Sequence, residues 1–144
     1  METKPSNYFE GILQLRDIGK EVIEFAVNAV EKDKGSHIAQ IKPVANGVDI
    51  YISRQRFLRS LGSKLQKRFG GQVIVSTRLH TRSKLTSRDL YRVNMLFRIP
   101  KFKKGDIIDY KGSKIKIVSI HHKVFAKDIQ TGKKLNLSFK DLLG

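Results

Sequence analysis

Hydrophobic and polar residues recur with regular periods along most of the 144-residue chain, which predicts regular structure over nearly its whole length. Alternating runs, in which every second residue is apolar, predict strands at residues 8–15, 37–44, 47–53, 72–79 and 89–98. Runs with helical spacing predict two amphipathic helices, at residues 19–32 and 54–69. The predicted order of elements is therefore β-α-β-β-α-β-β.

Local signals set the expected ends of these elements. Asn46-Gly47 separates two alternating runs and predicts a tight hairpin, because both residues tolerate positive φ. Asp17 and Ser53 stand where the N-caps of the two helices are expected. Lys34-Gly35 is expected to end the first helix, and Gly70-Gly71 to end the second.

The pattern changes after residue 100. Four short alternating runs follow, at residues 106–110, 114–121, 124–128 and 133–137, with a single closing turn at 138–142. Short strands separated by tight turns predict a small β-barrel. The predicted fold class is α+β, with an α/β domain at residues 1–99 and the barrel at residues 100–144. A barrel of this size would be marginal alone, so we expect it to lean on the first domain.

Charge is concentrated in the middle of the chain. The whole sequence has 29 basic and 13 acidic residues, a net charge of +16. The stretch from Arg54 to Lys104 contains 15 basic residues and only one acid, Asp89, so it carries +14 of that charge. Such a concentration repels itself, and a polyanionic partner, most often nucleic acid, is the simplest reason to tolerate it. A surface selected for solubility alone would mix both signs along the chain.

Two segments of this stretch present cations in a form suited to phosphate. The helix at 54–69 has an apolar face and a basic face, and it lacks the acidic partners at i±4 that a merely solvated helix commonly uses. The connection at residues 80–88 is rich in hydroxyls and cations, which bind phosphate oxygens. We expect the cations of the whole stretch to form one continuous face, whereas the acidic exposed face of the first helix should point away from nucleic acid. The predicted RNA- or ribosome-binding residues are Arg54, Arg56, Arg59, Lys64, Lys67, Arg68, Arg78, Arg82, Lys84, Arg88, Arg92, Lys101, Lys103 and Lys104.

Catalytic chemistry is not indicated. The sequence has no Cys, which removes disulfides, thiol nucleophiles and Cys-ligated zinc. His121 and His122 are adjacent near a turn, where their rings should point apart, and no nucleophile, base and orienting group assemble. We therefore predict a non-enzyme with no metal, no cofactor and no small-molecule substrate. Few aromatic residues are available to stack unpaired bases, which favours structured RNA as the ligand.

The sequence also lacks membrane and export signals. No apolar run approaches the roughly 20 residues that span a bilayer, and the N-terminus has no apolar signal region. We therefore expect a cytoplasmic protein that does not bind membranes, and we expect it to be a monomer.

Several motifs resemble the nonsense-mediated-decay protein three family, the adapters for maturation and export of the large ribosomal subunit. They are the run from Gly47 to Ser53, a helix rich in Leu and Lys or Arg, the run Leu85-Thr86-Ser87-Arg88-Asp89, and a strand ending at Ile99-Pro100. The resemblance covers residues 37–110 best. It implies a ribosomal-protein-like α/β domain followed by an SH3-like barrel similar to the N-terminal domain of translation factor 5A. The run Lys104-Gly105-Asp106-Ile107-Ile108 resembles the start of such a barrel. It also implies binding to the large subunit near the tRNA exit region.

The chain departs from that family in two ways: it lacks the paired Cys motifs of the zinc-binding domain, and it lacks the long tail with export and import signals found in eukaryotic members. We therefore expect a fragment that follows the zinc-binding part, or a homologue without it, of archaeal type. Two other functions stay open. One is an accessory domain of an RNA-processing enzyme. The other is a translation-factor-like, generic RNA-binding module acting on tRNA or mRNA, in which the barrel reads the RNA through Lys111, Lys114, Lys116, Lys123, Lys133 and Lys134.

Overall fold

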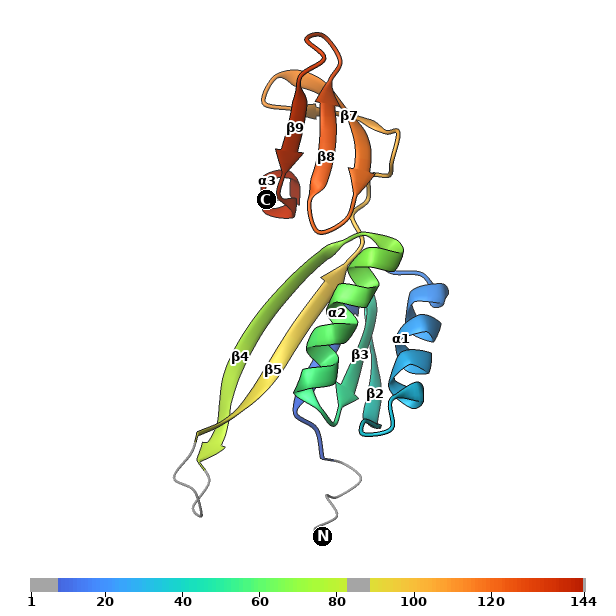
Figure 1. Cartoon of the computed structure of the whole chain (residues 1–144), viewed down its shortest axis with the longest axis vertical. Helices are drawn as coiled ribbons and strands as arrows, with labels where there is room; N and C mark the ends of the chain where they lie inside the picture. Colours follow the sequence, from blue (N-terminus) through green and yellow to red (C-terminus); the bar gives the residue numbers. More distant parts are fainter. Residues whose placement is uncertain (1–7, 83–88, 144) are drawn as a thin grey trace.

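The computed structural model describes residues 8–82 and 89–143, which form two β-sheets and three helices (Figure 1). The first sheet and its helices comprise β1 (Gly11–Arg16), α1 (Lys20–Lys32), β2 (Ile38–Val44), β3 (Gly47–Ile52), α2 (Gln55–Phe69), β4 (Gln72–Arg82) and β5 (Asp89–Arg98). The second sheet and its helix comprise β6 (Ile107–Tyr110), β7 (Ser113–Ile120), β8 (Val124–Asp128), β9 (Lys134–Leu137) and α3 (Phe139–Leu143). The predicted α+β class and the order β-α-β-β-α-β-β are confirmed.

The first sheet has the strand order β2-β3-β1-β5-β4, in which only the central pair β1–β5 is parallel. A two-residue turn, Ala45-Asn46, does join β2 to β3, which begins at Gly47, but neither Asn46 nor Gly47 has positive φ. Instead, a Cβ on Gly47 would lie 1.8 Å from the carbonyl oxygen of Leu15 on β1. Glycine is therefore needed there because two backbones approach closely, which is a different reason from the predicted one.

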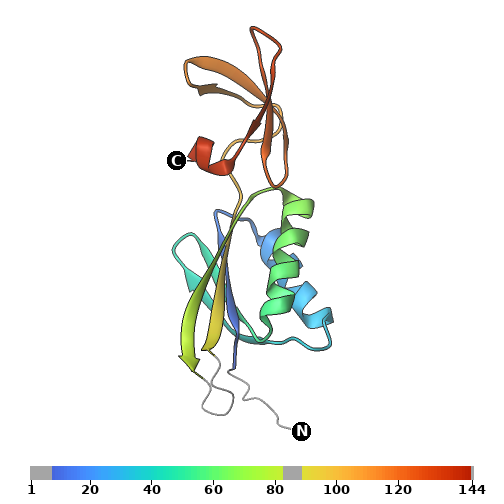
Figure 2. The same cartoon turned by 60° about the vertical axis from the view of Figure 1, so that its left-hand side comes forward.

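Both long helices cover one face of this sheet, and the opposite face has no helix over it in the described part of the chain (Figure 2). Alternation along the strands places one set of apolar side chains under the helices. The fully buried residues of this core are Leu13, Leu15, Ile50, Ile52, Val93 and Phe97 from strands, and Val22, Ala26, Val30, Leu58, Leu61 and Leu65 from helices. Gly62 lets α2 lie close to the sheet, because a Cβ there would come within 2.4 Å of the Met95 sulfur.

Three predicted helix caps are wrong. Asp17 lies before the helix with φ +54°, and the N-cap of α1 is Gly19. The C-cap of α1 is Asp33 in an extended conformation, so Gly35 does not end the helix. Ser53 is buried at the end of β3, where its hydroxyl accepts a 2.9 Å hydrogen bond from the His37 backbone N–H. At each of these three positions, the backbone conformation or a tertiary contact sets the end of the helix, and the capping preference of the residue does not.

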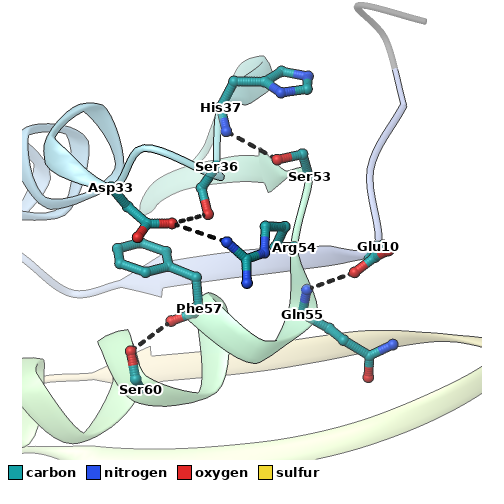
Figure 3. A network of polar contacts seen from close by, with 9 residues as sticks. All are labelled: Glu10, Asp33, Ser36, His37, Ser53, Arg54, Gln55, Phe57 and Ser60. Atoms are coloured by element: carbon teal, nitrogen blue, oxygen red, sulfur yellow. Dashed lines mark hydrogen bonds and ion pairs between the residues drawn. The ribbon is translucent and has the colours of Figure 1, made fainter. Parts of the chain in front are cut away.

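The start of α2 is held by a residue distant in sequence. Its N-cap, Arg54, makes no capping hydrogen bond through its side chain. The Gln55 backbone N–H instead donates a 3.0 Å hydrogen bond to Glu10, just before β1 (Figure 3). A carboxylate at this end also suits the positive pole of the helix dipole. The first turn of α2 is thus satisfied through tertiary structure.

The four strands of the second sheet pair in chain order, β6-β7-β8-β9, and all are antiparallel. Its core consists of Ile115, Ile117, Val124, Ala126, Leu137 and Phe139. No pairing joins β6 to β9 among the described residues, so the strands form an open meander and the predicted closed barrel is not found. The five-residue helix α3 follows β9 and contributes Phe139 to this core.

The second sheet meets the first unit at the C-terminal end of α2. The β7–β8 turn lies against this end in both views (Figures 1 and 2). The Gly71 backbone N–H donates a 3.2 Å hydrogen bond to the carbonyl of His121. Gly70 has φ +71°, and a Cβ on it would lie 2.4 Å from the carbonyl oxygen of Ile120. The two glycines that end α2 therefore also provide the contact with the second sheet.

Candidate nucleic-acid interface

The exposed side of α2 is entirely basic or neutral. Leu58, Leu61 and Leu65 recur at helical spacing and are buried against the sheet. Gly62 is buried with them, most of the other positions turn outward, and the sequence of α2 contains no acidic residue. Its exposed cations are Arg56, Arg59, Lys64, Lys67 and Arg68. The 15-residue helix therefore exposes five cations and no acid.

Aromatic rings support two of these cations. The Lys64 ammonium lies 5.6 Å from the ring centroid of Phe57, and the Arg68 guanidinium lies 5.9 Å from that of Phe25. At exposed sites such contacts contribute about 0.5–1 kcal/mol, which orders a side chain without neutralising its charge. Both side chains stay exposed and available to a phosphate.

Arg54 has an acidic neighbour. Its guanidinium lies 3.8 Å from the carboxylate of Asp33 at the end of α1, and Asp33 also accepts a hydrogen bond from Ser36 (Figure 3). A cavity of about 220 Å³ beside this pair is lined by Asp33, Arg54, Arg56, Phe57 and Ser60. The acid in its wall offsets the cations, so this end of α2 is less suited to phosphate than the middle of the helix.

The acidic surface of α1 borders the basic surface of α2. Glu21, Glu24 and Glu31 are exposed on α1, which packs beside α2 on the same face of the sheet (Figure 1). The prediction that α1 points away from nucleic acid stays a prediction, but α1 is not remote from the basic helix. The two charges lie on adjacent helices, and a polyanion on α2 would have to avoid the α1 side.

Cations of the strands lie on the other face of the sheet. Arg78 pairs with Arg92 across β4 and β5. The Arg92 guanidinium lies 3.8 Å from the Phe9 ring centroid and donates a 3.3 Å hydrogen bond to the Phe9 carbonyl. Strand alternation places both residues opposite the buried Val93, which faces the helices. The prediction of one continuous basic face is thus wrong, because the side chains divide between two faces of a sheet.

The remaining predicted residues fall in two places. Lys101, Lys103 and Lys104 are exposed in the connection between the two sheets. Lys84 and Arg88 lie outside the described residues, and for Arg82 only the backbone, as part of β4, is described.

Two features of the second sheet are not apparent from the sequence. Lys127 faces Lys116 on β7 and Lys134 on β9, so three exposed lysines form a row across neighbouring strands. Only the strand register reveals this row, because the sequence separates its members by several residues. The rings of His121 and His122 share a neighbour, because each lies 6.4 Å from the ring of Phe125, and that they point apart stays a prediction.

Neither a metal-binding cluster nor a membrane-spanning helix is found in the described ranges, 8–82 and 89–143. No cluster of three or more His, Asp or Glu side chains could hold a metal there. No helix of those ranges has the length and apolarity to cross a bilayer.

Comparison with known proteins identifies the family. A search of the curated proteins finds no match. Residues 8–99, more than half of the chain, match the family described as NMD3, second domain. These residues begin just before β1 and end just after β5, so they contain the whole first sheet and both long helices. NMD3 is a family of ribosome-associated adapters of the large ribosomal subunit. The chain belongs to the NMD3 family, as the resemblance in its sequence predicted.

Proposed function

We propose that this chain is a non-catalytic factor that binds the large ribosomal subunit during its maturation, and that the exposed basic face of α2 contacts ribosomal RNA. The observation that carries the proposal is the set of five exposed cations on α2, a helix without a single acid. Family membership supports the ribosome as the source of the RNA. Arg78 and Arg92 would need a second RNA segment, because they lie on the opposite face of the sheet.

This form of binding reads the RNA backbone and not the bases. Lys and Arg contacts to phosphate release condensed counterions, so the affinity falls as salt rises. Each phosphate contact adds about 0.7–0.9 to the slope of log affinity against log salt. Contacts with the grooves and backbone of folded RNA need no exposed aromatic platform. The α2 surface fits this form of recognition.

We extend the proposal to the layout and location of the chain. Residues 1–99 form a ribosomal-protein-like domain, and residues 100–144 form an SH3-like unit similar to that of translation factor 5A. The two separate apolar cores support this division. The chain acts as a cytoplasmic monomer of archaeal type and binds near the tRNA exit region of the large subunit.

Co-sedimentation with purified large and small ribosomal subunits over a salt series tests the proposal. We expect the chain to pellet with large subunits at low salt and to be released as salt rises, with a slope that corresponds to several phosphate contacts. Small subunits are the control for attraction to any RNA. Equal binding to both subunits, or binding that salt does not weaken, would contradict the proposal.

A second candidate is a generic RNA-binding module in which the second sheet contacts tRNA or mRNA. The lysine row favours it, because like charges directly opposite each other on neighbouring strands are destabilising. Lys116→Glu, Lys127→Glu and Lys134→Glu together should then abolish binding to tRNA, while reversal of the α2 cations should leave it intact. The opposite result on purified large subunits would favour the first function.

A further inference from the structure

A cleft lies between the end of α2 and the β7–β8 turn. It has a volume of about 250 Å³ and is lined by Ser63, Gln66, Lys67, His121 and His122. The first three residues come from α2, at positions i, i+3 and i+4, which place them on one side of the helix. The two histidines come from the second sheet. The cleft therefore exists only because the two sheets meet at this point.

Backbone and ring contacts fix both walls of the cleft. The His121 carbonyl accepts the hydrogen bond from the Gly71 N–H at the end of α2, at 3.2 Å. The His121 N–H in turn donates a 3.0 Å hydrogen bond to the Lys123 carbonyl, which closes the turn. Both imidazole rings lie beside Phe125. The histidines are thus held on a turn that is tied to α2, and their positions do not depend on a ligand.

The lining offers donors without an acid. Lys67 supplies an ammonium group, each imidazole supplies an N–H, and Ser63 supplies a hydroxyl. The Gln66 side-chain nitrogen donates a 3.1 Å hydrogen bond to the Gly71 carbonyl. Ammonium, imidazole and hydroxyl groups are donors to phosphate oxygens. A carboxylate, which would repel an anion, is not among the lining residues.

The volume of the cleft indicates the size of the chemical group that it can hold. About 250 Å³ is below the range in which a whole small-molecule ligand is buried, roughly 300–1,000 Å³. A single group of a longer polymer fits this space, while the rest of the polymer extends over the neighbouring surface. Lys67 also belongs to the exposed basic face of α2, so a polyanion on that face passes the mouth of the cleft.

We propose that this cleft binds one backbone phosphate of RNA, through Lys67, His121 and His122, so that a single RNA segment crosses from α2 to the second sheet. The proposal rests on the proposed function of α2 and adds two residues that no basic-charge pattern indicates. It also gives the contact between the two sheets a role, because the phosphate would hold both of them.

Spectra of the histidine rings test the cleft separately from the helix. The imidazole C–H signals of His121 and His122 are followed by NMR as an RNA hairpin is added, with His37 at the other end of α2 as the reference. We expect both signals to shift and to saturate with the binding curve, while His37 stays in place. Inorganic phosphate at the same phosphate concentration is the second arm, and we expect no saturation with it.

Substitutions distinguish RNA binding by the cleft from a general effect of the positive charge of the protein. Lys67→Ala, and the pair His121→Ala with His122→Ala, should each weaken hairpin binding by about tenfold, as expected for lost hydrogen bonds to a charged group. Lys42→Ala, at an exposed position of β2, removes the same charge as Lys67→Ala and should have little effect. Urea unfolding of each variant shows whether the fold is kept. His121→Gln and His122→Gln retain a donor and should recover part of the affinity.

The outcomes distinguish the two proposals. If the hairpin binds with the expected salt dependence while the His121 and His122 signals stay still, the cleft proposal is wrong and the α2 proposal stands. Saturation by inorganic phosphate alone would show a site for the free ion, which also overturns an RNA-backbone site. If the hairpin does not bind at all, both proposals fail.

Discussion

Two helices that pack side by side on one sheet both bury apolar side chains but differ in the residues that they expose to solvent. In α1, Val22, Ala26 and Val30 are fully buried, and in α2, Leu58, Leu61 and Leu65 are. Neither helix makes a capping hydrogen bond through its N-cap side chain. The exposed side of α1 carries Glu21, Glu24 and Glu31, whereas α2 exposes only cations and neutral residues. The buried side of each helix thus determines the fold, while the exposed side is free to determine the partner.

Charge reversal on α2 should cause the largest loss of binding to large ribosomal subunits. Replacement of Arg56, Arg59, Lys64 and Lys67 by Glu should weaken binding to large subunits by at least about 100-fold, because four phosphate contacts become repulsions. Co-sedimentation at fixed salt measures the loss, and circular dichroism checks that the helix content is kept. The four residues are exposed, so the fold should survive.

The matched control reverses the charge of two exposed residues on the neighbouring helix, α1. Glu24→Lys with Glu31→Lys on α1 should keep or slightly increase subunit binding, because it removes negative charge beside the basic surface. An equal loss of binding from both helices would show that the difference between them does not matter for the ribosome.

Shortening a buried side chain of either helix should lower the free energy of unfolding of the protein. Leu61→Ala should lower the free energy of unfolding by about 3 kcal/mol, because it removes a fully buried side chain and leaves a cavity. Val30→Ala on α1 should lower it by about 1.5 kcal/mol, since its side chain is smaller. Urea denaturation measures both. Subunit binding by the folded fraction should not change, and a specific loss of binding in Leu61→Ala would contradict the separation of the two sides.

Much of this fold can be predicted from the spacing of apolar residues, because a helix or strand that is buried on one side has apolar residues at regular intervals in its sequence. The bounds of β5 and β8 agree with the predicted ranges 89–98 and 124–128. Contacts between residues that are distant in the sequence produce no such regular spacing. Glu10 satisfies the start of α2 and the Leu15 carbonyl requires Gly47, and neither contact is visible as a local motif.

The same limit applies to the candidate site. The charge count identified the cations of α2, whose helical spacing already places them on one side. It could not separate them from Arg78 and Arg92, because only the strand pairing and the Phe9 contact place those two on the other face. It also could not find the lysine row or the histidine cleft, because register and the contact between the two sheets create them.

The ends of the two helices also differ, and a smaller effect should follow from that. α1 ends in an extended residue, whereas α2 ends at Gly70, with φ +71°, against the Ile120 carbonyl of the second sheet. Gly70→Ala should cost about 2 kcal/mol, because it combines an unfavourable backbone conformation with a clash. Gly105→Ala is the control: φ is +94° there, and nothing lies within 4 Å of an added Cβ.

The difference between the two glycine variants isolates the contact between the sheets. We expect about 1 kcal/mol for Gly105→Ala, from the backbone alone. Urea denaturation gives both values, and amide hydrogen exchange at Gly71 reports its hydrogen bond to His121. Equal losses, with slow exchange at Gly71 in both variants, would show that the second sheet does not depend on this contact.

The smallest effect is expected in α3, which begins with a cap that α1 and α2 lack. The Ser138 N–H donates to the Asp141 carboxylate at 3.1 Å, and the Asp141 N–H donates to the Ser138 hydroxyl at 3.1 Å. The Ser138 backbone N–H, followed by its side chain, lowers the pKa of Asp141 below its ordinary value of 3.8. A depressed folded pKa means that the ionised carboxylate stabilises α3 above pH 3.8, and that this is lost as the pH falls through the folded pKa.

Titration of the Asp141 carboxyl carbon by NMR measures the folded pKa directly. Asp141→Asn should increase amide exchange in α3 at neutral pH, and its difference from the wild type should shrink as the pH falls below the folded pKa. Asp109→Asn, on β6, removes the same charge from the second sheet and should leave α3 unchanged. A five-residue helix is too short to form by propensity, so a difference that persisted at all pH values would mean that packing of Phe139, and not the cap, holds α3.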